Sequence, residues 1–67
     1  MNEKLLKANG KLIRYHSTVY RVLAFKLGNR TLADADPINA GERINLVKTR
    51  SELGKALRNL VDLGLFV

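Results

Sequence analysis

The lack of cysteine in a chain of only 67 residues is the sequence feature that most limits how the protein can fold. A domain this short buries only about 60% of the surface of its unfolded chain, so its stability is marginal. Natural domains of this size often add disulfides, a metal or a partner subunit. Disulfides are excluded here, and without thiolates the single histidine, His16, cannot form a classical zinc site. We therefore expect one domain over residues 1–67, without metal or cofactor, that depends on a well-packed core or on homodimerisation.

The clearest secondary-structure element lies in the last third of the sequence. Thr49 and Glu52 have the spacing of a helix capping box, in which each side chain bonds to the other residue's backbone amide. Five apolar residues follow at the spacing of one helical face: Leu53, Ala56, Leu57, Leu60 and Val61. Gly64 can adopt the left-handed conformation that ends a helix. The pattern predicts an amphipathic helix from about Arg50 to Leu63, in which Gly54 costs about 1 kcal/mol unless something packs closely against it.

The rest of the chain has the composition of a β-sheet. Val19–Leu27 is rich in β-branched and aromatic residues, and we expect it to be a strand buried on much of both faces. Shorter strands are predicted at Lys11–His16, Arg30–Ala33 and Arg43–Val47. Gly28-Asn29 suits a two-residue turn, and the composition of Asp34–Gly41 is typical of a loop. The predicted fold class is α+β: a small antiparallel sheet of three to five strands, with one C-terminal amphipathic helix packed on one face.

The Asn9-Gly10 dipeptide has two interpretations. It suits a tight turn that joins a strand at Lys4–Ala8 to a strand at Lys11–Tyr15. It also suits the end of a short helix that begins at Asn2. A helix of about seven residues is marginal without packing, so the hairpin is favoured.

The charge distribution points to an anionic partner. The net charge is +6, and residues 1–33 hold seven basic side chains against Glu3 alone. No acidic residue occurs from Lys4 to Ala33, whereas the two signs balance in residues 34–67. A basic surface of this kind favours nucleic acid, through phosphate contacts, or an acidic protein surface.

The residue inventory argues against an enzyme. Catalytic triads need a nucleophile, a base and an orienting group in contact, but Ser17 directly follows His16 on a predicted strand end. Ser51 belongs to the first helical turn. Asp34 and Asp36 lack the ligand spacing of a calcium loop, and we expect them to cap their own loop instead.

The candidate binding site follows from an expected strand pairing. If the strands around Ser17-Thr18 meet in a tight turn, Tyr15 lies opposite Tyr20, and Arg14 lies opposite Arg21. Like charges opposite each other destabilise a sheet, so such a pair indicates an anion site, and exposed tyrosines can stack on unpaired bases. The nine predicted nucleic-acid contacts are Lys7, Lys11, Arg14, Tyr15, His16, Tyr20, Arg21, Lys26 and Arg30.

The C-terminal segment resembles part of a winged-helix DNA-binding domain. Recognition helices of that family often end in a Leu-x-x-x-Gly-Leu pattern, matched here by Leu60, Gly64 and Leu65. The resemblance covers under a third of the chain. The family also has a helix just before this one and a wing after it, but residues 43–47 favour a strand and the sequence stops at Val67. We therefore interpret the apolar helical stripe as core packing.

A protein-interaction module or small inhibitor is the alternative function. Very short, basic chains without cysteine are frequent among accessory proteins of phages and mobile elements. The apolar segment Leu65–Val67 can fold onto the sheet or pair with a second copy as an added strand. The sequence contains no signal-peptide pattern and no membrane-spanning stretch, so a cytoplasmic protein that does not contact membranes is expected.

Overall fold

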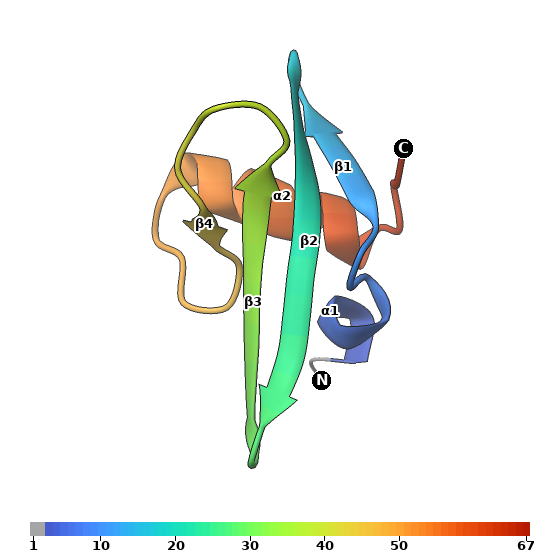
Figure 1. The fold of residues 1–67 in the computed structure, drawn as a ribbon, viewed down its shortest axis with the longest axis vertical. Helices are drawn as coiled ribbons and strands as arrows, with labels where there is room; N and C mark the ends of the chain where they lie inside the picture. The colour runs from blue at the N-terminus through green and yellow to red at the C-terminus, as the bar shows by residue number, and fades with distance from the viewer. Residues whose placement is uncertain (1–2) are drawn as a thin grey trace.

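A computed structural model describes residues 3–67, and it confirms the α+β class. Its elements, in chain order, are α1 (Glu3–Lys7), β1 (Leu12–Tyr15), β2 (Thr18–Leu27), β3 (Arg30–Pro37), β4 (Ile44–Asn45) and α2 (Glu52–Asp62). The four strands form one antiparallel sheet in the order β1-β2-β3-β4. Figure 1 shows α2 crossing behind the sheet, while the opposite face carries no helix. Within residues 3–67, no helix is long and apolar enough to cross a membrane.

The core lies between one face of the sheet and the two helices. Along β2 the buried side chains alternate, with Tyr20, Val22 and Ala24 facing inwards. Leu57 and Val61 of α2 pack into the same cluster, as the helical stripe predicts. The expectation that this strand is buried on much of both faces is wrong, because the intervening residues of β2 lie on the open face and are partly or fully exposed.

The segment before β1 is helical, so the favoured hairpin at Asn9-Gly10 is wrong. Residues 3–7 form α1, and Gly10 has a φ of 84°, the left-handed conformation that a chain uses on leaving a helix. Packing overcomes the weakness of so short a helix, because Leu5 and Ala8 are fully buried in the core. The predicted start of this helix at Asn2 lies outside the described residues.

Asn9 links α1 to the sheet through its side chain. The buried Ala24 of β2 donates its backbone N–H to Asn9 Oδ1 at 2.9 Å, just past the point where β1 pairing stops. Asn9→Ala should lower the free energy of unfolding by about 1–3 kcal/mol, because it leaves that amide unpaired. Urea unfolding measures the loss. Asn9→Asp is the control, since it keeps the acceptor oxygen; an equal loss in both variants would contradict this role.

The β1–β2 register differs from the predicted one by two residues. The turn is at His16-Ser17, where His16 has a φ of 56°, and Tyr15 pairs with Thr18. Arg14 therefore lies opposite Val19 rather than opposite Arg21. The shift is even, so each side chain stays on its expected face.

The β3 strand continues through part of the predicted loop. The turn at Gly28-Asn29 is confirmed, but Asp34–Pro37 belong to the strand and pair with β2. The alternation explains this, because Ala33 and Ala35 are buried while Asp34 and Asp36 face the open side. The expectation that the two aspartates cap a loop is wrong.

The ends of α2 agree only partly with the capping prediction. Ser51, not Thr49, is the N-cap, and its hydroxyl accepts from the Gly54 amide at 3.0 Å. At the other end Gly64 has a φ of 71°, and the Leu65 amide donates to the Leu60 carbonyl at 3.0 Å. This is a Schellman motif, which confirms the predicted role of the glycine.

Candidate nucleic-acid interface

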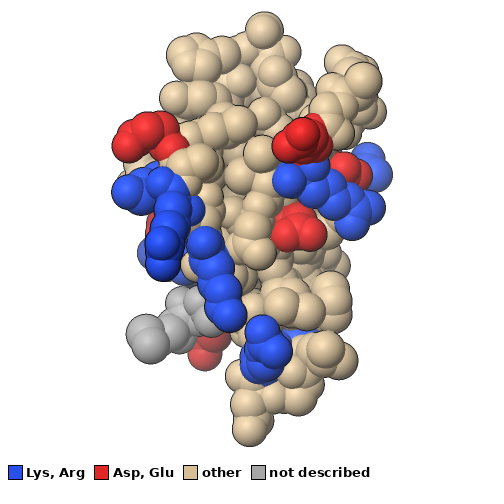
Figure 2. Space-filling view, turned by 90° about the vertical axis from the view of Figure 1, so that its left-hand side faces the viewer, with Lys and Arg blue, Asp and Glu red and all other residues tan. Residues whose placement is uncertain are grey.

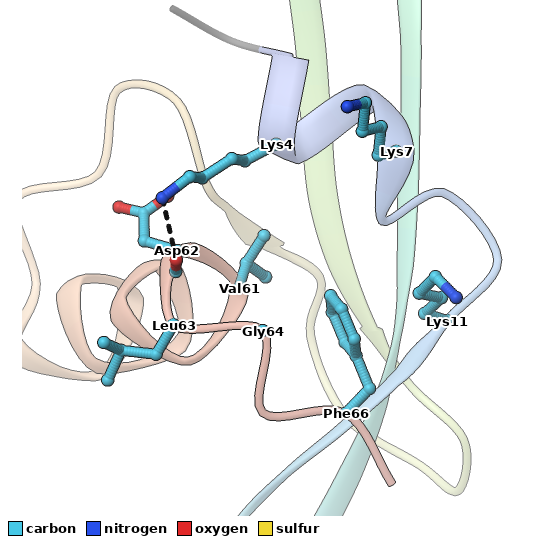
Figure 3. A pocket seen from close by; sticks show the side chains of 8 residues that line it. All are labelled: Lys4, Lys7, Lys11, Val61, Asp62, Leu63, Gly64 and Phe66. Carbon is cyan, nitrogen blue, oxygen red and sulfur yellow. Dashed lines mark hydrogen bonds between the residues drawn. The ribbon is translucent and has the colours of Figure 1, made fainter.

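Three lysines gather around a pocket between α1 and the end of α2. Lys4 and Lys7 belong to α1, and Lys11 follows the turn at Gly10. The pocket has a volume of about 240 Å³ and is lined by Lys4, Lys7, Lys11, Val61, Asp62, Leu63, Gly64 and Phe66 (Figure 3). We call it the lysine pocket. Its lining is largely apolar apart from the three lysines and Asp62.

The chain after α2 supplies the aromatic wall of the lysine pocket. Gly64 redirects the chain, and the Val67 amide donates to the Leu12 carbonyl of β1 at 2.8 Å. The C-terminal residues therefore lie against the chain's own sheet, which is the first of the two alternatives that the sequence allows. This places Lys11 Nζ 5.4 Å from the centre of the Phe66 ring, within cation–π range. Figure 3 shows the ring between Lys11 and Val61.

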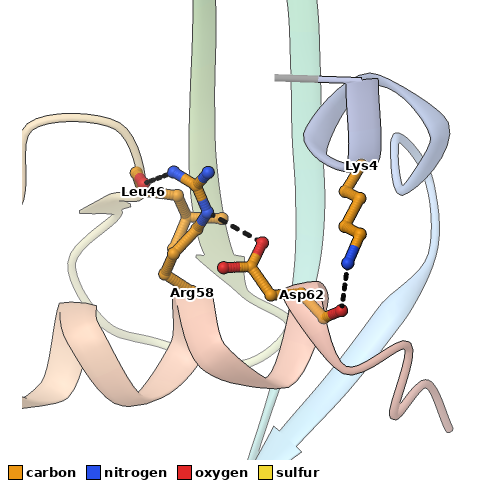
Figure 4. A network of polar contacts seen from close by, with 4 residues as sticks. All are labelled: Lys4, Leu46, Arg58 and Asp62. Atoms are coloured by element: carbon orange, nitrogen blue, oxygen red, sulfur yellow. Dashed lines mark hydrogen bonds and ion pairs between the residues drawn. The ribbon is translucent and has the colours of Figure 1, made fainter. Parts of the chain in front are cut away.

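The acidic group nearest the pocket is already engaged. Arg58 Nε donates to the Asp62 carboxylate at 3.1 Å, and Arg58 Nη1 donates to the Leu46 carbonyl at 3.0 Å (Figure 4). Lys4 Nζ instead donates to the backbone carbonyl of Asp62 at 3.1 Å, at the negative end of the α2 dipole. Among residues 3–67 the ion pairs are Arg58–Asp62 and Arg43–Asp36, so the pocket lysines keep their charge unneutralised by carboxylates.

The open face of the sheet, by contrast, carries both signs of charge. Arg14 and Arg21 lie on it, as predicted. Arg21, however, lies opposite Asp36 in the register of β2 and β3, and the Asp36 carboxylate forms an ion pair with Arg43 at 3.4 Å. The segregation of charge along the sequence therefore disappears on the folded sheet, because β3 brings its aspartates beside β2. Figure 2, viewed from the β4 edge of the sheet, shows acidic and basic side chains near one another on that side of the molecule as well.

Neither of the two tyrosines predicted to stack on bases is fully exposed. Tyr20 is buried in the core, with 7% of its surface exposed. Tyr15 is half-buried on the same face, and its ring centre lies 4.3 Å from that of His16 in an edge-on arrangement. Phe25 and Phe66 are the exposed aromatic residues of the described chain.

The nine predicted contacts thus divide among separate surfaces. Lys7 and Lys11 meet in the lysine pocket, whereas Arg14 and Arg21 share the open face. Lys26 and Arg30 are exposed near the far end of the β2–β3 hairpin, which extends past the helices in Figure 1.

The sequence analysis did not include Lys4 and Phe66, which line the lysine pocket. The spacing of Lys4 and Lys7 would have placed both on one side of a helix, whereas the favoured strand placed them on opposite faces. No protein-family model, curated protein or solved structure matches this chain.

Proposed function

We propose that the protein is a small, non-catalytic, nucleic-acid-binding regulatory protein of the cytoplasm, and that the lysine pocket is its contact surface. One observation carries this proposal: three lysines line a largely apolar pocket, and among residues 3–67 none of them forms an ion pair. Such unneutralised cations can bind the phosphate groups of a nucleic acid. This binding releases the counterions that surround the nucleic acid, which favours association.

Single-stranded DNA or RNA is the partner that this geometry favours. Phe66 is 37% exposed at the pocket, beside Lys11. An unpaired base can stack on such a ring while the adjoining phosphates contact the lysines, whereas the bases of a duplex are stacked on one another. The Phe66 ring is the feature that favours nucleic acid over an acidic protein surface. Binding of an acidic protein surface would require only the positive charges of the lysines. A second copy of the chain, the third partner expected from the sequence, suits the open sheet face instead.

The test is fluorescence-anisotropy binding to single-stranded DNA, RNA and duplex DNA across a salt series. The wild-type protein should prefer single strands, and its affinity should fall steeply as salt rises. A triple variant combines Lys4→Glu, Lys7→Glu and Lys11→Glu. It should reduce the slope of log affinity against log salt by about 2, because each lost contact to a single-strand phosphate reduces that slope by about 0.7.

A matched control separates the pocket from general charge. The control variant combines Lys48→Glu, Arg50→Glu and Lys55→Glu, three exposed basic residues outside the lysine pocket. Its net charge is the same as that of the triple variant of the pocket lysines. It should weaken binding only modestly. Equal losses in the two triple variants would overturn the assignment of the pocket. An absence of binding at low salt would overturn the nucleic-acid proposal and leave an acidic protein partner.

A further inference from the structure

The open face of the sheet is apolar over much of its length. The cross-strand pairs place six apolar side chains on it: Leu12, Val19, Leu23, Phe25, Leu27 and Leu32. Phe25 is 55% exposed and Leu27 is 61% exposed, and no helix covers this face in Figure 1. Contiguous apolar surface of this kind is typical of a protein interface.

The charges on this face identify its occupant. Asp34 and Asp36 would repel phosphates and acidic protein surfaces, while Arg14 and Arg21 would repel a basic partner. A surface that carries both signs is complementary to a copy of itself. We propose that a second copy of the chain packs on the open face to form a two-fold symmetric dimer.

The register of β2 and β3 specifies the arrangement of this dimer. A two-fold axis parallel to the strands and between β2 and β3 exchanges the two strands when the sheets stack face to face. Each residue then lies opposite its own cross-strand partner in the second copy. Arg21 meets Asp36 of the second copy, because these two residues are paired in the register. Phe25 meets Leu32 of the second copy for the same reason.

The size of the molecule determines how much of the face a stable dimer would need. In the plane of the sheet, the Cα envelope measures 34 by 20 Å. A standard protein interface buries about 800 Å² on each partner. The face therefore reaches the area of a standard interface only if most of it is buried. Face-to-face stacking of the two sheets about an axis along β2 and β3 would bury most of it. The dimer would also cover the exposed Phe25, whose burial supplements the small core.

Sedimentation equilibrium across micromolar to millimolar concentrations tests the dimer. Wild-type protein should sediment with the mass of two chains. Arg21→Glu and Asp36→Arg, each alone, should sediment as monomers, because each places like charges opposite each other between copies. An equimolar mixture of the two variants should regain the dimer mass. In the mixed dimer the introduced glutamate of one copy faces the introduced arginine of the other, and the unchanged Asp36 faces the unchanged Arg21.

The mixing experiment distinguishes an interface from a folding defect, because mixing cannot repair a defect inside one chain. Phe25→Ser is a second variant that should be monomeric with a circular dichroism spectrum like that of the wild type, since Phe25 is exposed. Lys55→Glu, on the helix side, should remain a dimer. A wild-type protein that stays monomeric throughout, or a mixture that stays monomeric, would overturn the proposal and leave the face to a different protein.

Discussion

Replacing Leu57 with alanine is expected to lower the free energy of unfolding by about 2–5 kcal/mol. Leu57 is completely buried in the middle of α2 and belongs to the same hydrophobic cluster as Val22 and Leu46 of the sheet side. The total stability of a 67-residue domain is about 3–10 kcal/mol at ordinary values per residue. The substitution should therefore remove a large part of it and leave a measurable unfolded fraction in buffer alone.

Leu63→Ala is the matched control for this prediction. Leu63 follows α2 directly, and 61% of its surface is exposed. Its truncation should change the free energy of unfolding by no more than about 0.5 kcal/mol. Urea unfolding followed by circular dichroism measures both variants, with the midpoint expected to move and the slope to stay constant. Similar costs for the two substitutions would contradict the assigned position of Leu57 in the core.

Gly54→Ala is expected to destabilise the protein, although alanine normally stabilises a helix by about 1 kcal/mol relative to glycine. Gly54 is buried on the face of α2 that contacts the preceding loop. A Cβ at this position would lie 2.6 Å from the Cβ of Thr49 and would also overlap its hydroxyl. Overpacking of this kind costs about 1–3 kcal/mol.

A double-mutant cycle with Thr49→Gly isolates the steric cause. Thr49→Gly removes every side-chain atom that the new methyl group would overlap. In that background Gly54→Ala should become stabilising, because only the helical preference of alanine then remains. Thermal or urea unfolding of the four proteins gives the coupling free energy. The same cost for Gly54→Ala in both backgrounds would rule out the contact with Thr49 as its cause.

The helical stripe and the strand order could be predicted from the sequence because both depend on local periodicity. The position of the helix cap could not, because Thr49 and Ser51 are both good capping residues and lie two positions apart. The Asn9-Gly10 dipeptide fits a hairpin turn and a helix end equally well. The choice between them depends on the burial of Leu5 and Ala8 in a core that forms only in the complete fold.

The candidate site was harder to predict because it depends on residues far apart in the sequence. The Phe66 ring reaches Lys11 only because Gly64 turns the chain back towards β1. The pairing of Arg21 with Asp36 depends on β3 continuing through a segment whose composition is typical of a loop. The alternation of alanine and aspartate in that segment was the available signal, and it indicates a half-buried strand.

The β2–β3 hairpin has a consequence for the solubility of the folded chain. Its far end, residues 25–32, extends past the helices, and β1 and β4 do not pair with it in the described chain. Free strand edges can recruit further strands without limit, which leads to fibrous aggregates. Lys26 and Arg30 lie on these free edges, and charged side chains there oppose such growth. Two residues predicted to contact phosphate thus have a second effect, because their charges oppose strand-by-strand growth at the end of the hairpin.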